Sequence, residues 1–139
     1  MFKNMKTLII TLACICLSTI GFAQNTELSK LNQQDDLYYL NGKPYTGKVF
    51  AKHENGNIGM VGEIKAGKKE GTWTYWYSTG EKKRESTYIH NKKEGITYYW
   101  HPNGQVAKEI MYRDDKNIDQ KLWDANGNRL KNPSFQSFK

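Results

Sequence analysis

A spacing of 24 residues constrains the fold of this 139-residue chain more than any other feature. Three sets of turn-forming residues keep that spacing: Gly47, Gly71 and Gly95; Gly56, Gly80 and Gly104; and Gly67, Asn91 and Asp115. A fourth unit is one residue shorter, because Gly127 follows Gly104 by 23 residues. Periods of about 20–50 residues are typical of arrays in which each unit packs on its neighbours. We therefore expect one elongated repeat domain over residues 37–130.

Each unit contains two segments with the pattern of a β-strand. Residues 72–77 and 96–101 are rich in Thr, Tyr and Trp, which favour strands. Asn-Gly or Thr-Gly pairs separate the strands, and Asn-Gly is typical of type I′ hairpin turns. The predicted fold class is all-β, an elongated antiparallel meander sheet of β-hairpin repeats. Its structural turns contain seven glycines: Gly47, Gly56, Gly71, Gly80, Gly95, Gly104 and Gly127.

The side chains between the glycines also repeat. Residues 71–76 (GTWTYW) match residues 95–100 (GITYYW), and residues 85–88 (ESTY) match residues 109–112 (EIMY). This pattern resembles the bacterial variant of the MORN repeat, over about residues 37–130. The resemblance implies a surface for binding or assembly, and proteins of this shape resemble the YwqK-like antitoxin family. It implies no particular ligand.

The first 23 residues have the layout of a secretory signal peptide. Lys3 and Lys6 precede an uncharged run over residues 7–20, and small residues precede a cleavage site at Ala23-Gln24. As a helix, the run spans about 21 Å, less than the ~30 Å of a bilayer core. We expect export to the periplasm or the medium, with a lipoprotein anchored through Cys14 as a minor alternative.

Removal of the signal peptide changes the chemistry open to the chain. Both cysteines, Cys14 and Cys16, leave with it, so the mature chain has no disulfide and no cysteine nucleophile. The 21 Lys and Arg fall to 19 against 14 Asp and Glu, so the net charge falls from +7 to +5. Export argues against nucleic acid as a partner, and no cofactor is expected. Residues 24–36 are expected to be a polar linker, and residues 131–139 a flexible tail.

The polar residues predict neither a catalytic nor a metal site. The three histidines lack a metal-ligand spacing. Glu85 and Glu109 share one repeat position, which is typical of charges laddered along a sheet, and Lys83 and Arg84 are near enough in sequence to pair with them. Hydrolysis by two carboxylates requires that they converge in a cleft. We therefore expect a protein that is not an enzyme.

Aromatic side chains are the first candidates for binding. Strand alternation places Trp76 and Trp100 on one face of the sheet, and Tyr75 and Tyr99 on the other. Their repetition favours cross-strand packing, whereas exposed rings along one face favour stacking on a sugar or a peptide. The candidate binding residues are Tyr75, Trp76, Tyr77, Tyr99 and Trp100.

Lysines from equivalent turns are the second candidate. They are expected to line one long edge of the sheet: Lys68, Lys69, Lys92, Lys93 and Lys116. A basic edge can bind anionic lipid or glycan. It can equally be a solvated edge that limits aggregation, and Glu70 and Glu94 in the same turns lower its charge.

These features predict an exported, non-catalytic binding or scaffold protein whose repeat sheet holds another protein. One alternative is an antitoxin-like neutraliser of a partner toxin. Another is association with the envelope surface through the lysine edge. The terminal strands near residues 37–40 and 128–130 are further candidates, because an open edge can accept a strand from a partner. The sequence leaves the oligomeric state open.

Overall fold

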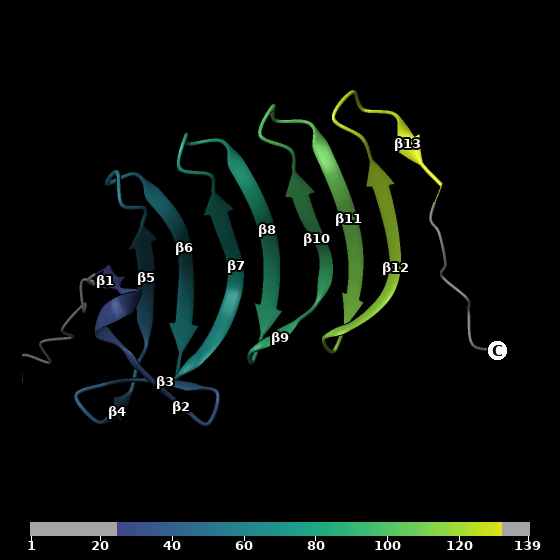
Figure 1. Cartoon of the computed structure of the whole chain (residues 1–139). Coiled ribbons are helices and arrows are strands. Elements are labelled where there is room, and N and C mark those ends of the chain that lie inside the picture. The colour runs from purple at the N-terminus through teal and green to yellow at the C-terminus, as the bar shows by residue number, and fades with distance from the viewer. Residues whose placement is uncertain (1–24, 132–139) are drawn as a thin grey trace, which may run out of the picture.

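The computed structural model describes residues 25–131, which form two β-sheets (Figure 1). The large sheet has ten strands in the order β1-β5-β6-β7-β8-β10-β11-β12-β13, with β9 beside β8. Its consecutive strands from β5 to β13 are antiparallel, and the short β1 pairs in parallel with β5. The predicted fold class, an all-β meander of hairpin repeats, is confirmed.

The strands of the large sheet are β1 (Thr26–Glu27), β5 (Gly47–Lys52), β6 (Ile58–Lys65), β7 (Lys68–Trp76), β8 (Lys82–Ile89), β9 (Lys92–Lys93), β10 (Gly95–Trp100), β11 (Val106–Arg113), β12 (Lys116–Trp123) and β13 (Arg129–Leu130). The small sheet consists of β2 (Asn32–Gln34), β3 (Leu37–Leu40) and β4 (Lys43–Pro44). A single turn of 3-10 helix, η1 (Leu28–Lys30), joins β1 to β2.

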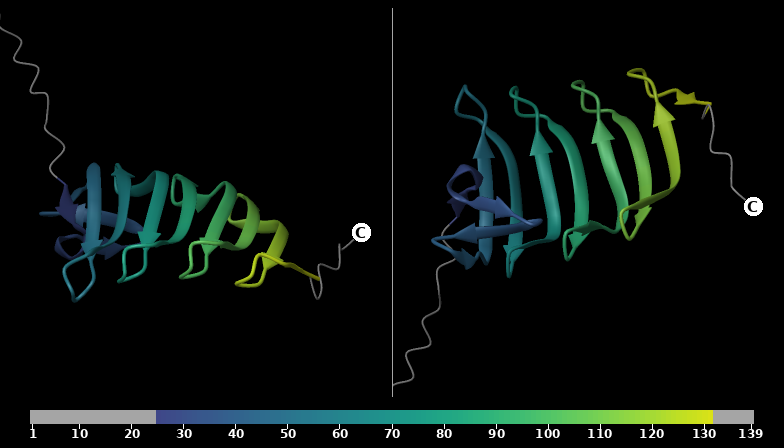
Figure 2. Two further views of the ribbon diagram at one scale, coloured as in Figure 1. Left: turned by 90° about the horizontal axis from the view of Figure 1, so that it is seen from above. Right: turned by 60° about the horizontal axis from the view of Figure 1, so that its bottom comes forward.

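The small sheet crosses in front of the lower ends of β5, β6 and β7 (Figures 1 and 2). Backbone hydrogen bonds fasten it there: the Tyr38 N–H donates to the Gly67 carbonyl at 2.8 Å, and the Gly67 N–H donates to the Tyr45 carbonyl at 2.7 Å. The structure differs here from the expected polar linker over residues 24–36, because residues 26–34 form β1, η1 and β2. Leu28 and Leu31 pack against the core and give this polar segment its anchor.

The turns of the upper edge, as seen in Figure 1, contain the Asn-Gly pairs, but they are not of type I′. A type I′ turn needs two residues with positive φ. Here only the glycine has one, as at Gly56 (φ +85°) and Gly104 (φ +85°). The Gly56 N–H donates to the His53 carbonyl, and the His53 N–H donates to the Asn57 carbonyl. The loop therefore has three residues, a length that favours a type I turn followed by a left-handed glycine, and the type I′ prediction is wrong.

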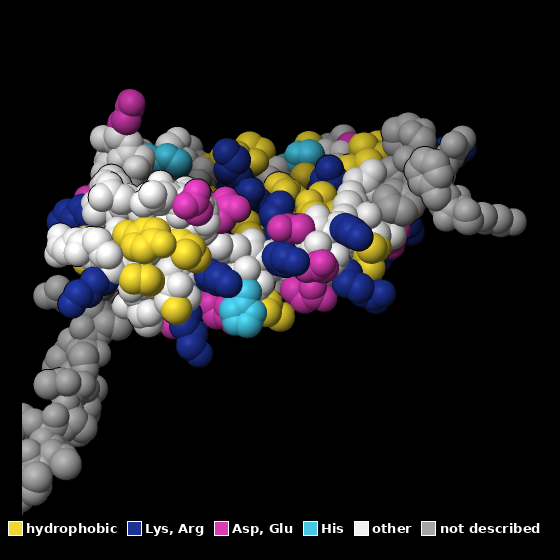
Figure 3. Space-filling model, turned by 90° about the horizontal axis from the view of Figure 1, so that it is seen from below, with side chains coloured by type: hydrophobic (Ala, Val, Ile, Leu, Met, Phe, Trp, Pro, Cys, Tyr) yellow, Lys and Arg dark blue, Asp and Glu magenta, His cyan; other side chains and the backbone are white. Residues whose placement is uncertain are grey.

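The type I′ geometry lies instead at the lower edge of the sheet. Pairs of residues with positive φ occur there at Ala66-Gly67, His90-Asn91 and Asp114-Asp115. Gly67, Asn91 and Asp115, one of the three repeated sets of turn-forming residues, thus all have left-handed backbone. Seen from below, Lys and Arg alternate with Asp and Glu along this edge (Figure 3).

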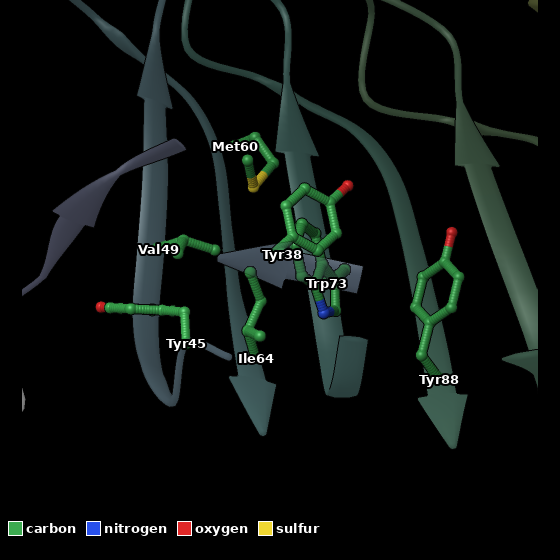
Figure 4. Packing of buried hydrophobic residues seen from close by; sticks show 7 residues of the cluster. All are labelled: Tyr38, Tyr45, Val49, Met60, Ile64, Trp73 and Tyr88. Atoms are coloured by element: carbon green, nitrogen blue, oxygen red, sulfur yellow. The ribbon is translucent and has the colours of Figure 1, made fainter. Parts of the chain in front are cut away.

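The hydrophobic core lies between the small sheet and the first strands of the large one (Figure 4). Its centre is Trp73, which has no exposed surface and whose indole covers Gly62. Farther along the sheet the same row holds the buried pair Ser86 and Thr97, joined by a hydroxyl hydrogen bond of 3.2 Å. Seven residues form the core cluster: Tyr38, Tyr45, Val49, Met60, Ile64, Trp73 and Tyr88.

The predicted signal peptide at 1–23 and the alternative lipid site at Cys14 lie outside the described residues, as does most of the expected tail over 131–139. Within residues 25–131, no helix has the length and apolar character needed to cross a membrane.

Candidate functional site

The large sheet has two faces with different chemistry. We call the face that packs on the small sheet the inner face, and the opposite one the outer face. Strand register places Tyr75 and Tyr99 on the inner face, and Trp76 and Trp100 on the outer face. The candidate aromatics are therefore divided between the two faces, although Tyr75, Trp76 and Tyr99 all line one hollow at the upper edge. One row of paired residues crosses the whole inner face, here called the upper row: Ala51, Met60, Tyr75, Arg84, Tyr99, Lys108 and Leu122.

Arg84 stands between Tyr75 and Tyr99 in the upper row. Its guanidinium carbon lies 3.8 Å from the centre of the Tyr75 ring, which is a stacking distance. Its Nε is buried and has no hydrogen-bond partner among residues 25–131. We grouped Arg84 with Lys83 as a partner of Glu85, but Arg84 faces the side opposite to Glu85, because adjacent residues of a strand alternate.

A second row of aromatic and basic residues, the lower row, crosses the same face nearer the lower edge: Ile64, Lys69, Tyr88, Lys93 and Tyr112. The Lys69 Nζ lies 4.8 Å from the Trp73 ring centre, 5.3 Å from that of Tyr88 and 5.9 Å from that of Tyr38. Burial lowers the pKa of Lys69, and the charges of Arg84 and Lys93 lower it further.

The predicted lysine edge is therefore divided. Lys69 and Lys93 turn onto the inner face, where Lys93 Nζ lies 4.7 Å from the Tyr112 ring centre. Lys68, Lys92 and Lys116 remain exposed at the lower edge.

Carboxylates at the lower edge bond to backbone N–H groups of the turns and to one of the exposed lysines. Lys92 pairs with Asp114 at 2.6 Å. Glu70 accepts a hydrogen bond from the His90 N–H, and Glu94 accepts one from the Asp114 N–H. The lower edge is thus an edge of mixed charge.

Tyrosine hydroxyls from the two rows approach one another over the inner face. Burial raises the pKa of Tyr88 to about 12, and the neighbouring Tyr75 hydroxyl contributes to the rise. Burial likewise raises the pKa of Tyr112, helped by the charge of Tyr99 and a side-chain hydrogen bond with it. The two middle repeats each contribute one pair of tyrosines, Tyr75 with Tyr88 and Tyr99 with Tyr112, and Arg84 lies among these rings.

Upper-edge residues at the 24-residue spacing connect each unit to the next. His53 Nε2 lies 3.0 Å from the Trp76 carbonyl, the Tyr77 hydroxyl donates to the Trp100 carbonyl at 2.8 Å, and His101 Nε2 lies 3.0 Å from the Trp123 carbonyl. A carbonyl only accepts, so Nε2 carries the proton in both histidines. This link between neighbouring units was not predicted from the sequence, although the 24-residue spacing of the three side chains could have indicated it.

The last unit ends this series. Asp124 stands at the equivalent position, but its carboxylate accepts hydrogen bonds from Asn126 N–H and Asn128 N–H in its own turn. The side-chain amide of Asn128 also donates to the Asp124 carboxylate at 3.0 Å, and this bond, followed by the one from the Asn128 N–H, holds the pKa of Asp124 below its usual value.

Two hollows lie at the edges of the inner face. A hollow of about 250 Å³ at the upper edge is lined by residues that include His53, Tyr75, Lys83, Arg84 and Tyr99. A larger one, about 600 Å³, lies at the lower edge, where acidic and basic side chains of the turns alternate.

The repeated carboxylates of the strands lie on the outer face. Glu85 pairs with Lys82 at 2.8 Å and Glu109 pairs with Lys121 at 3.4 Å, so they form the ladder of charges that the sequence predicts. Within residues 25–131, no group of three or more His, Cys, Asp or Glu side chains could hold a metal ion.

Two segments of the chain, residues 69–90 and 93–114, match the family described as MORN repeat variant. The matches begin 24 residues apart and cover β7 to β8 and the following unit, β9 to β11. No curated protein and no solved structure matches the chain, so the resemblance to the YwqK-like antitoxin family has no support from a relative. The repeats and the sheet fit a repeat-based binding or scaffold protein.

Proposed function

We propose that this protein is an exported, non-catalytic scaffold that holds a protein partner on the inner face of its large sheet. The observation that carries the proposal is the open part of that face. The small sheet covers the lower ends of β5 to β7, whereas no second layer of the described chain covers β10 to β12 (Figures 1 and 2). An uncovered sheet face with half-buried aromatic side chains is suited to a partner.

The residues of this open inner face suit a protein partner. They include Arg84, Tyr99, Lys108, Tyr112 and Leu122, all of them half-buried. Tyr and Arg are enriched among the residues that contribute most to protein–protein affinity. The outer face is less suited, since its carboxylates are already paired with lysines.

The non-catalytic part of the proposal rests on the position of the carboxylates. Glu85 and Glu109 lie in one outer-face row, each bonded to a lysine, and do not line the hollow beside Arg84. The export part rests on the pattern of residues 1–23. A cell that expresses the full chain should release a protein that begins at Gln24, and the intact mass of the purified protein checks this.

Affinity capture from an envelope extract tests the binding surface. The exported protein is compared with an inner-face variant, Tyr99→Ala with Leu122→Ala, and an outer-face variant, Tyr98→Ala with Trp100→Ala. We expect a partner, identified by mass spectrometry, that the inner-face variant loses and the outer-face variant keeps. Loss with the outer-face variant alone, or no partner above an unrelated bait, contradicts the proposal. A toxin among the captured proteins would make the scaffold a neutraliser.

A further inference from the structure

The basic residues of the upper and lower rows have no acidic neighbours within those rows. The upper and lower rows contain Lys69, Arg84, Lys93 and Lys108, and none of their members is Asp or Glu. The ion pairs within residues 25–131 lie elsewhere, with Lys82–Glu85 and Lys121–Glu109 on the outer face and Lys92–Asp114 at the lower edge. The two rows are therefore positive. Asp35, Asp36 and Asp115 line the hollow of about 600 Å³ at the lower edge together with Lys69, whereas Arg84 is not among the residues that line it.

Among these basic residues, Arg84 has a buried N–H donor that lacks an acceptor in the described chain. A guanidinium carries five N–H donors, yet its Nε is buried without a hydrogen-bond partner in the described chain. A buried donor without a partner costs free energy, and such groups in folded proteins call for an explanation. The guanidinium carbon lies 3.8 Å from the centre of the Tyr75 ring, and Arg84 lines the hollow of about 250 Å³.

The positive charge of Lys69 near Arg84 is a second reason to expect an anion at this place. Lys69 is half-buried and lies close enough to Arg84 for the guanidinium charge to oppose its own. An anion near the two would offset a repulsion that no residue of these rows offsets. Carboxylates suit a guanidinium best, because the two oxygens can accept two parallel N–H bonds.

We propose that Arg84 recognises a carboxylate of the partner, and that the partner offers it within an acidic protein segment. The proposal rests on the protein-binding function proposed above and names its chemistry. Tyr75 and Tyr99 stand one strand to either side of Arg84, so their rings are about 10 Å apart across the sheet. This spacing lets an Asp or Glu reach Arg84 while apolar side chains of the same segment lie on the tyrosines.

A binding assay with defined probes tests the proposal. The probes are a fluorescent Glu-Tyr copolymer, dextran sulfate, inorganic phosphate and vesicles with anionic lipid, each titrated with the exported protein. We expect Arg84→Gln to weaken copolymer binding roughly 10- to 100-fold, the loss that corresponds to one charged hydrogen-bonded pair. The matched control, Arg113→Gln, removes an exposed cation near the lower edge and should change affinity less than about twofold. Arg84→Lys should restore only part of the affinity, because ammonium cannot form the paired bonds.

The urea midpoint of each variant separates binding from folding. Arg84→Gln loses the contact with the Tyr75 ring but also removes the repulsion with Lys69, so it should unfold close to the wild-type urea midpoint. Copolymer affinity equal to that of wild type in Arg84→Gln overturns the proposal, as does a wild-type protein that binds the sulfate, the phosphate or the vesicles but not the copolymer. Absence of binding to every probe also overturns it.

The capture experiment distinguishes this failure from failure of the proposed function. If Arg84→Gln retains a partner that the inner-face variant loses, the scaffold function stands and the role of Arg84 is wrong. If neither the exported protein nor any variant retains a partner, the scaffold function itself fails.

Discussion

The indole of Trp73 lies on Gly62, so close that a Cβ at position 62 would come 2.3 Å from the indole carbon Cδ2. Gly62→Ala should therefore force the central side chain of the core to move, at a cost of about 1–3 kcal/mol in the free energy of unfolding. Urea denaturation measures the loss. Gly59→Ala, in the same strand, is the comparison. Its Cβ would come 2.9 Å from His53 Nε2, so we expect a smaller loss, which arises from the bond of that nitrogen to the Trp76 carbonyl. Equal losses for both variants would contradict the proposed packing.

Tyr77→Phe removes one bond between neighbouring units. The variant keeps the ring but leaves the Trp100 carbonyl without the hydroxyl donor that lies 2.8 Å away. We expect a loss of about 1–2 kcal/mol in the free energy of unfolding, because the carbonyl is partly buried. Tyr98→Phe is the control, as the Tyr98 hydroxyl makes none of the hydrogen bonds observed within residues 25–131. A Tyr77→Phe variant as stable as this control would show that the bond contributes nothing.

Asn91→Ala should be costly because Asn91 has two roles at the lower edge. Its φ of +75° is unfavourable for alanine, and its side chain bonds the Lys69 N–H and the Asp36 carbonyl, each at 2.6 Å. Together these effects predict a loss of about 2–3 kcal/mol.

Asn91→Asp is the informative comparison for that position. The next unit already uses Asp115 in the same way, with its carboxylate 2.8 Å from the Lys93 N–H. Aspartate keeps this acceptor and tolerates left-handed backbone, so only the bond to Asp36 is lost. Thermal unfolding of the two variants side by side should therefore rank Asp well above Ala, and the opposite ranking would exclude a role for the acceptor.

Alkaline pH should weaken the fold through Tyr88. Its folded pKa is raised to about 12 from an ordinary value of 10.0, mainly by burial. Between these values the unfolded chain releases the proton and the folded chain retains it, so the free energy of unfolding falls as pH rises through that window. Urea midpoints measured across it should decline less steeply in Tyr88→Phe. A residual slope is expected from Tyr38 and Tyr112, whose pKa values burial also raises.

The sequence predicts the sheet well because its period is carried by backbone requirements. Glycine and Asn recur where φ must be positive, and strand alternation assigns Tyr75 and Trp76 to opposite faces without any knowledge of packing. The type I′ prediction for the Asn-Gly turns of the upper edge is wrong, because Asn-Gly also suits a three-residue loop in which only the glycine is left-handed. Distinguishing the two requires the length of the loop, which depends on where strand pairing ends.

The candidate site was harder to predict than the sheet. Arg84 and Lys108 occupy the same repeat position, and both side chains are cationic. Neither the 24-residue spacing nor the composition therefore identifies Arg84 as a candidate binding residue. Its position between Tyr75 and Tyr99 depends on the pairing register of β7, β8 and β10, which the repeat spacing alone does not give. The sequence predicts Lys69 and Lys93 on one basic edge with the other turn lysines, as either a binding site for anions or a solvated edge. Their side chains turn instead onto the aromatic rings beside them, which sequence spacing does not show.

The bonds of the upper edge run in one direction only, from each unit to the carbonyl of the next, until Asp124 bonds within its own turn. This gives the array a defined terminus and a modular middle. If a 24-residue unit were duplicated between Tyr77 and His101, its backbone carbonyl would accept the bond from the preceding unit, and its own donor would bond the carbonyl of the following unit. A unit added after Asp124 would receive no such bond, because Asp124 bonds within its own turn. Gene duplication can thus widen the sheet in steps of about 10 Å without redesigning either end.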